Sequence, residues 1–234
     1  MFAAVFVAVA VLNLIIADRL APVTFSANTH PVVERFHEFF GKRLRLVRYG
    51  VAVVFGLLFA APTVGRWQDW LMFRNSASFG IRDAQFGNDV GFYMFKLPFV
   101  TFVVDWLYLA VAFITVMVLA THVLSGGIVL QPPRPKVRKA TKAHIAVLLA
   151  VLAVLKAADY WVTPYELTTA NRGSFTGPNY TVVNAQLPAV LLLVLIALLT
   201  AVLFLSALKT DAWRPAVVAS VLWAVVALIG GVLY

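Results

Sequence analysis

Long apolar runs separated by short polar stretches dominate the pattern of this chain. Each run is close to twenty residues long, the length that an α-helix needs to cross about 30 Å of hydrocarbon. A transmembrane β-barrel would instead show segments of about ten residues with alternating hydrophobicity. The pattern therefore predicts an all-α, polytopic transmembrane helical bundle. We predict about six spans, over residues 1–17, 48–65, 101–124, 143–162, 187–208 and 215–234.

Composition agrees with this class. Hydrophobic residues make up 62% of the 234 residues and charged residues only 12%, and the mean hydropathy is +0.90. A soluble domain would carry about a quarter charged residues. The chain has no cysteine, which excludes disulfides, cysteine-bound zinc and thiol nucleophiles.

Lys and Arg concentrate in alternate connections between the predicted spans. Loops 18–48 and 125–142 and the turn 209–214 hold thirteen of the nineteen basic residues but only four acids. Because basic loops stay on the cytoplasmic side of a membrane, we expect loops 18–48 and 125–142 to be cytoplasmic and both termini of the chain to be extracytoplasmic. This placement explains the net charge of +9 without a nucleic-acid partner. The lipid bilayer is the expected partner.

Two connections, 66–100 and 163–186, are expected on the outer side. The first contains "FGIRDAQFGNDVGFYMFKLPF" (79–99), which is too polar to span a membrane and unusually aromatic for a loop. We predict that this stretch is an interfacial aromatic segment on the membrane surface, leading into a span at Leu97–Pro98. Its candidate residues are Asp83, Phe86, Asp89, Phe92, Tyr93 and Phe95.

Two acids of this segment have two interpretations. Asp83 and Asp89, with Asn88, could gather around a cation, but their spacing does not match an EF-hand loop. The favoured interpretation is that they cap short helices and turns, with nearby glycines supplying special backbone angles. We therefore predict no metal site and no cofactor.

Ionisable residues within or near the spans are few. Asp105, Lys156 and Asp159 are candidates for an intramembrane polar pair, because burying charge in hydrocarbon is costly. Asp105 and Lys156 both fall towards the outer ends of their predicted helices, so they could pair. The favoured alternative is that Lys156 reaches outward or pairs with Asp159, three residues along the same helix. His122, near an inner end, is interpreted as a hydrogen-bonding interface residue.

The chain shows no catalytic motif. It lacks a Walker A loop, GxSxG, HExxH and a GxGxxG before a helix, so we expect no enzyme activity. No internal repeat is apparent either.

Four stretches together resemble the UPF0182 family of bacterial integral membrane proteins. They are the 79–99 segment, "HVLSGGI" (122–128), "NRGSFTGPNYTVVNAQLPA" (171–189) and "NLIIADRLAP" (13–22). Two positions depart from the expected pattern: Ala84 replaces a proline, and Val182 stands where an aspartate is expected. The resemblance implies a bacterial plasma-membrane protein with about seven spans followed by a large extracytoplasmic region, of which this chain would be the N-terminal membrane part. It implies no activity.

Two functions are open at this point. The leading hypothesis is a helical membrane anchor or scaffold, whose outer loops organise a protein partner or the extracytoplasmic domain of the same polypeptide in the cell envelope. The alternative is a transporter or channel component for lipid or another envelope substrate. It would use a cavity near Asp105, Lys156 and Asp159, capped by the 79–99 segment.

Overall fold

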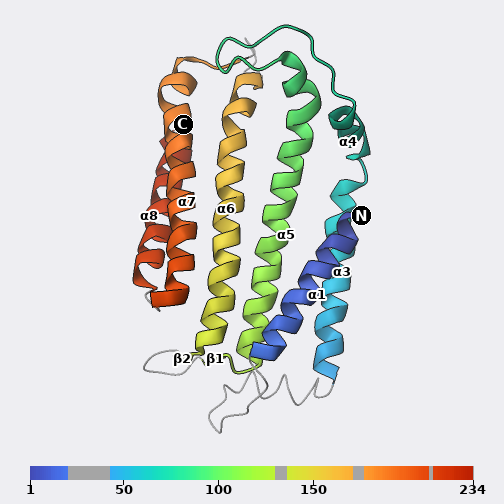
Figure 1. Ribbon diagram of the computed structural model, residues 1–234, viewed down its shortest axis with the longest axis vertical. Helices are drawn as coiled ribbons and strands as arrows, with labels where there is room; N and C mark the ends of the chain where they lie inside the picture. Colours follow the sequence, from blue (N-terminus) through green and yellow to red (C-terminus); the bar gives the residue numbers. More distant parts are fainter. Residues whose placement is uncertain (21–42, 130–135, 171–176, 211–212, 234) are drawn as a thin grey trace. The chain divides into compact units, whose positions relative to one another are not determined.

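The computed structural model describes residues 1–20, 43–129, 136–170, 177–210 and 213–233 (Figure 1). Most of the predicted basic loop 18–48, and parts of loops 125–142 and 163–186, lie outside these residues. The α-helices are α1 (Phe2–Leu20), α3 (Leu44–Ala60), α4 (Trp67–Arg74), α5 (Leu97–Leu124), α6 (Lys139–Thr169), α7 (Leu187–Thr210) and α8 (Arg214–Leu233). The shorter elements are the 3-10 turn η2 (Ala61–Thr63), the π-helical turns η3 (Phe92–Lys96) and η4 (Val182–Gln186), and the strands β1 (Ile128–Val129) and β2 (Lys136–Val137).

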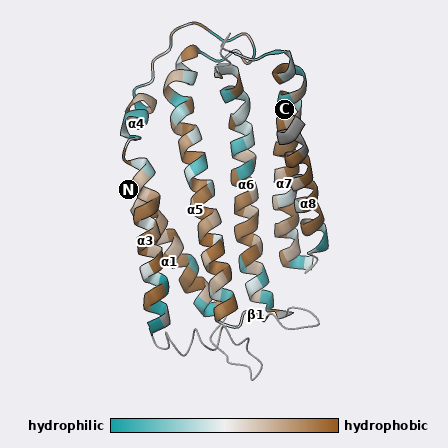
Figure 2. Ribbon diagram, turned by 180° about the vertical axis from the view of Figure 1, so that it is seen from behind, coloured by the Kyte–Doolittle hydropathy of each residue, from teal (hydrophilic) through white to brown (hydrophobic). Residues whose placement is uncertain are grey.

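Helices account for nearly all of this structure, which confirms the all-α prediction. Within the described residues, five helical segments are long and apolar enough to cross a membrane. The sixth predicted span falls on α8, whose apolar stretch Arg214–Leu228 is shorter. Figure 2 shows hydrophobic residues along most of each long helix. Many of them are also exposed, such as Leu195 (64%) and Val202 (60%) on α7, as expected of helices that face lipid.

The described chain forms two compact units, and α5 and α6 pass through both. The first unit contains residues 1–64 and 110–148, and α1 lies beside α3 in it (Figure 1). Its core includes four phenylalanine rings with centroids 4.0 to 6.2 Å apart, an arrangement that contributes about 0.5–1.5 kcal/mol per pair beyond simple burial. These rings belong to Phe6, Phe55, Phe59 and Phe113.

Close packing of α1 on α3 depends on Gly56. A Cβ at this position would run into the Cγ2 atom of Val7. We expect Gly56→Ala to push Val7 away and to lower the free energy of unfolding by about 1–3 kcal/mol. Gly50→Ala in the same helix is the matched control, because a Cβ there meets nothing within 4 Å. Thermal melting in detergent checks the prediction, which fails if the two variants melt alike.

The second unit contains residues 65–109 and 149–234. In it α7 and α8 lie side by side (Figure 1). Small side chains let these helices and α6 approach closely, and Phe204 fills the space between them. The buried alanines of this cluster are Ala150, Ala153, Ala201 and Ala216.

Two helices of the second unit start with the same local structure, ninety residues apart. The π turn η3 is followed by Leu97–Pro98, and the π turn η4 by Leu187–Pro188. Proline lacks an N–H, and its ring would clash with the carbonyl four residues earlier in an α-helix. The wider π turn relieves this clash. The structure thus contains a local repeat that the sequence pattern did not make apparent.

Candidate functional site

The segment 75–91, which we call the Asp loop, follows α4. It leads into the helical stretch that begins at Val90 and continues through η3 into α5. Asp89 holds its two ends together. Oδ1 of Asp89 accepts hydrogen bonds from the backbone N–H groups of Phe79 (3.0 Å) and Gly91 (2.7 Å). Oδ2 accepts from the N–H of Gly80 (2.9 Å) and the hydroxyl of Ser78 (2.5 Å). One carboxylate therefore closes the loop and caps the start of the following helix.

Asp83 holds the turn at the far side of the Asp loop. Its Oδ1 accepts from the N–H groups of Gln85 (2.8 Å) and Phe86 (2.7 Å). Its Oδ2 accepts from the N–H of Asn88 (2.9 Å) and the hydroxyl of Tyr93 (2.8 Å). Both acids thus act on the backbone, in line with the capping interpretation. The described residues contain no group of three side chains suited to hold a metal ion.

Glycines serve the Asp loop in two different ways. Gly80 and Gly87 have φ values of 72° and 70°, which other L residues rarely adopt. Gly91 has an ordinary φ of −59°, but a Cβ there would collide with the carbonyl oxygen of Ala77. The first two glycines supply turns, whereas the third provides room.

The hydrogen bonds of the Asp loop lower the pKa values of its acids. The Ser78 hydroxyl, followed by the N–H groups of Phe79 and Gly91, holds the pKa of Asp89 at about 2. Partial burial raises the pKa of Asp83, but hydrogen bonds, of which that from Phe86 is the largest contributor, outweigh it and lower the pKa. Both carboxylates are therefore ionised at neutral pH.

This ionisation predicts acid opening of the Asp loop. A carboxylate whose pKa is lowered on folding stabilises the loop above its unfolded value, near 3.8, and this stabilisation is lost as the pH falls towards the folded value. We expect the loop to stay closed at about pH 5 and to open between about pH 4 and pH 2. Hydrogen exchange at the amides of Phe79, Gly80 and Gly91, corrected for the intrinsic rate, measures this. Opening at pH 6 would contradict the assignment.

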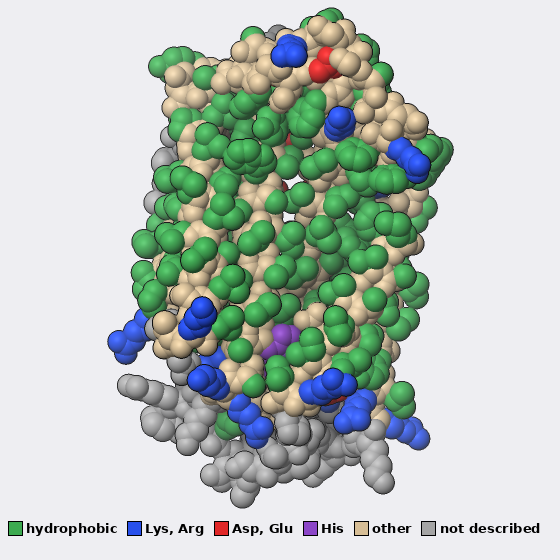
Figure 3. Space-filling model, viewed as in Figure 1, with side chains coloured by type: hydrophobic (Ala, Val, Ile, Leu, Met, Phe, Trp, Pro, Cys, Tyr) green, Lys and Arg blue, Asp and Glu red, His purple; other side chains and the backbone are tan. Residues whose placement is uncertain are grey.

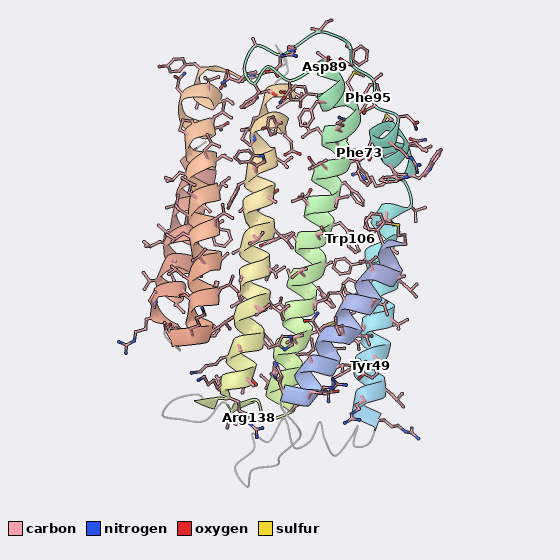
Figure 4. All side chains as sticks on the ribbon, in the orientation of Figure 1. Tyr49, Phe73, Asp89, Phe95, Trp106 and Arg138 are labelled. Atoms are coloured by element: carbon pink, nitrogen blue, oxygen red, sulfur yellow. The ribbon has the colours of Figure 1, made fainter. Side chains whose placement is uncertain are left out.

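Aromatic side chains pack the Asp loop and the helix start after it against the C-terminal end of α6. The rings of Phe86 and Phe92 lie 4.9 and 5.4 Å from that of Tyr165, centroid to centroid. The ring of Phe95 stacks on that of Phe79 at 5.8 Å. Figure 4 shows Phe95 and Asp89 near the start of α5. The structure brings all six residues proposed for the interfacial segment into one loop and one helix start. Their place at a membrane surface stays a prediction.

A cavity of about 350 Å³ lies between the Asp loop, the end of α6 and the start of α7. Its lining is mostly apolar, with one amide side chain. The lining residues include Gln85, Phe86, Trp161, Tyr165, Val183 and Leu191. A cavity of this size and lining suits a hydrophobic group.

The three ionisable residues predicted to lie in or near the spans, Asp105, Lys156 and Asp159, belong to the second unit. Lys156 donates a hydrogen bond to Asp159 at 2.5 Å. The ammonium of Lys156 also lies over the rings of Tyr108 (5.4 Å) and Tyr160 (4.9 Å). Asp105 is exposed on α5, near enough to feel both charges. Because α6 continues to Thr169, Lys156 lies near the middle of its helix and not close to the end that was predicted to be the outer one. The functional role of the three residues stays a prediction.

Sequence reasoning missed a polar cluster in the first unit. His122 is fully buried and contacts His144 and Thr141, and His144 in turn contacts Asn13. These residues come from three helices and are up to 131 positions apart, so no local spacing links them. The sequence did hold one signal for this cluster. His144 and Asn13 fall at the same ends of their predicted spans as His122 does.

Comparison with known proteins places this architecture in a family. The sequence profile described as "Uncharacterised protein family (UPF0182)" matches residues 1–234. A UPF0182 protein of Frankia alni is 38% identical over 233 residues, which cover 99% of this chain and 23% of that protein. Those of Rhodococcus jostii and Mycobacterium avium are each 37% identical, over 86% and 94% of this chain and 21% and 22% of their own lengths. The chain thus spans between a fifth and a quarter of the length of these relatives. No solved structure matches it.

Proposed function

The chain belongs to the UPF0182 family, and we propose that it is a helical membrane anchor whose Asp loop and adjoining helix ends hold an extracytoplasmic partner in the bacterial cell envelope. The partner is either another protein or a further domain of the same polypeptide. The relatives are several times longer than this chain, which supports a further domain of the same polypeptide as the partner.

The observation that carries this proposal is the ordering of the Asp loop. Asp83 and Asp89 accept four hydrogen bonds each, although ordering a loop costs conformational entropy. The ordered loop presents large apolar side chains outward, with Ile81 65% exposed and Phe79 49% exposed. Apolar side chains held in a fixed arrangement at the end of a helical unit are typical of a surface that receives a partner.

Photocrosslinking in native membranes tests the proposal. A benzoylphenylalanine in place of Ile81 should form adducts with protein, seen as bands of higher mass. The matched control is Leu195 on α7, which is almost equally exposed at 64% and should react with lipid alone. If both positions crosslink only to lipid, the Asp loop does not hold a partner.

A specific observation also favours a second candidate, a transporter or channel component. Lys156, Asp159 and Asp105 are ionisable side chains within the predicted spans, where such residues are costly and mark pathways in other membrane proteins. The cavity beneath the Asp loop offers space for an apolar substrate, such as a lipid.

Single substitutions distinguish the two candidates. Lys156→Ala and Asp105→Ala variants that keep normal protein levels but lose an uptake or export phenotype would favour transport. We expect instead that Lys156→Ala lowers abundance, because Asp159 loses its ion-pair partner inside the helical unit. Asp105→Ala should change abundance less, since Asp105 is exposed and takes part in no ion pair recorded among the described residues.

A further inference from the structure

A chain of hydrogen bonds runs through the interior of the first unit. The ring Nε2 of His122 lies 3.2 Å from Nδ1 of His144, and Nδ1 of His122 lies 3.3 Å from the hydroxyl of Thr141. Nε2 of His144 lies 3.1 Å from Oδ1 of Asn13. His122 and Thr141 are fully buried, and His144 is 8% exposed. The chain therefore joins α5, α6 and α1 where water is nearly excluded.

The backbone fixes the direction of every bond in this chain. Nδ2 of Asn13 donates to the carbonyl oxygen of Val9 at 2.8 Å, and a carbonyl can only accept. Oδ1 of Asn13 therefore faces His144, whose Nε2 must carry a proton. In a neutral His144, Nδ1 is then an acceptor, so Nε2 of His122 carries a proton as well. Nδ1 of His122 is left to accept from the hydroxyl of Thr141.

This directed chain has room for one more proton. A proton added to Nδ1 of His122 needs an acceptor, and the hydroxyl of Thr141 becomes one by rotating. The pair then holds three N–H protons, and the central one is shared between Nε2 of His122 and Nδ1 of His144. A second added proton would place two N–H groups face to face across 3.2 Å, with no acceptor between them.

We propose that His122 and His144 form a single proton-binding site, which takes up one solvent proton per chain and uses Thr141 as the acceptor of the protonated state. This inference goes beyond the anchoring function and rests on a different unit of the chain. The uptake moves one proton from water onto the imidazole pair and reverses the hydrogen bond between His122 and Thr141, so the three helices stay joined in both states.

The charges around the site are compatible with one added proton. Among the described residues of this unit, Asp18 of α1 is the sole acid. Two arginines of α3 pair with Asp18: Nη1 of Arg48 lies 2.6 Å from its Oδ1, and Nε of Arg45 lies 3.9 Å from its Oδ2. The other charged or titratable side chains of the described residues of this unit are Arg19, Arg43, Tyr49, Lys136, Arg138, Lys139 and Lys142. Because the described part of this unit holds one acid and many cationic side chains, a second positive charge on the histidine pair would be repelled.

The imidazole nitrogens of His122 and His144 suit a metal ion less well than they suit an added proton. Only two nitrogens face each other, and the outer nitrogen of each ring already has a partner. Within the described part of the chain, no third His, Cys, Asp or Glu joins them in a group that could hold a metal. A closed zinc site would need four ligands.

Histidine NMR on the full chain in detergent tests the proposal. His30 and His37 are replaced by asparagine, so that only His122 and His144 report from ¹⁵N-labelled histidine. We expect both rings in the Nε2–H form at about pH 8. On acidification, as long as the helical circular dichroism persists, the two rings together should gain one proton. Uptake of two protons, of none, or an Nδ1–H form of either ring at about pH 8 would overturn the assignment.

Substitutions at Thr141 test its role as acceptor. Thr141→Val keeps the shape but removes the hydroxyl, and should lower the proton affinity of the pair about tenfold or more, as expected for losing a hydrogen bond to a charged group. Thr141→Ser should titrate like the parent. Thr115→Val is the control, because Thr115 is also buried (4% exposed) and its hydroxyl donates to the carbonyl oxygen of Val111 in its own helix. Equal titration of Thr141→Val and Thr115→Val would refute the acceptor role, even if one variant is less stable.

Discussion

Gly91→Ala is expected to break the Asp loop, with the largest effect of the substitutions considered. The added Cβ would meet the carbonyl oxygen of Ala77, with Oδ1 of Asp89 only 2.9 Å away. Because the first obstacle is backbone, no side-chain rotation relieves the clash. Overpacking of this kind costs about 1–3 kcal/mol and more where the surroundings cannot move. The loop should separate from the start of α5.

Limited proteolysis between residues 75 and 91 measures this opening. Gly65→Ala is the control, because a Cβ at Gly65 meets nothing within 4 Å and neither Gly65 nor Gly91 has a positive φ. A difference in cleavage rate between the two variants is therefore due to the steric clash of the added Cβ and not to a backbone angle. If both are cleaved at the same rate, the close approach of Gly91 to Ala77 is not what holds the loop.

Asp89→Asn is expected to have the second-largest effect. The amide has the shape of the carboxylate, but it offers one oxygen and one NH₂ group in place of two acceptors. With the NH₂ group at the Oδ1 position, the N–H groups of Phe79 and Gly91 would both face another donor; at the Oδ2 position the N–H of Gly80 would, while the Ser78 hydroxyl could rotate to accept. We expect cleavage within the Asp loop to rise about tenfold or more, while the melting of the long helices changes little.

Asp69→Asn provides the comparison for Asp89. Asp69 also takes part in a charged interaction, an ion pair with Arg66 at 2.9 Å on the same helix turn. Exposed pairs of this kind contribute little, so Asp69→Asn should leave cleavage of the loop unchanged. Increased cleavage in both variants would mean that general loss of negative charge, and not the geometry at Asp89, opens the loop.

Local patterns predicted much of this structure. The apolar runs located the long helices because hydrophobic length is a property of the sequence alone. The polar and glycine-rich character of 79–99 identified the residues that form the Asp loop, since capping by aspartate and turns at glycine act over a few residues. The role of Gly91 was less accessible, because its requirement is the approach of Ala77 and not a backbone angle.

Other features could not be predicted because they depend on contacts between distant segments. The end of α6 extends to Thr169, past Pro164, where the rings of Phe86 and Phe92 pack on Tyr165. The pairing of His122 with His144 requires α5 and α6 to turn matching faces towards each other. The π turns follow from proline chemistry, but only the structure shows that Pro98 and Pro188 begin equivalent helix starts.

Labelling of introduced cysteines tests most directly the central claim that the Asp loop lies on the extracytoplasmic side, where it could hold its partner. The chain contains no cysteine, so each variant carries a single reactive thiol. Ile81→Cys lies at an exposed position of the loop, and Lys139→Cys at an exposed position beside the basic loop. We predict that a membrane-impermeant maleimide labels Ile81→Cys in intact cells and Lys139→Cys only after permeabilisation. Labelling of Ile81→Cys only after permeabilisation, or labelling of Lys139→Cys in intact cells, would contradict the account.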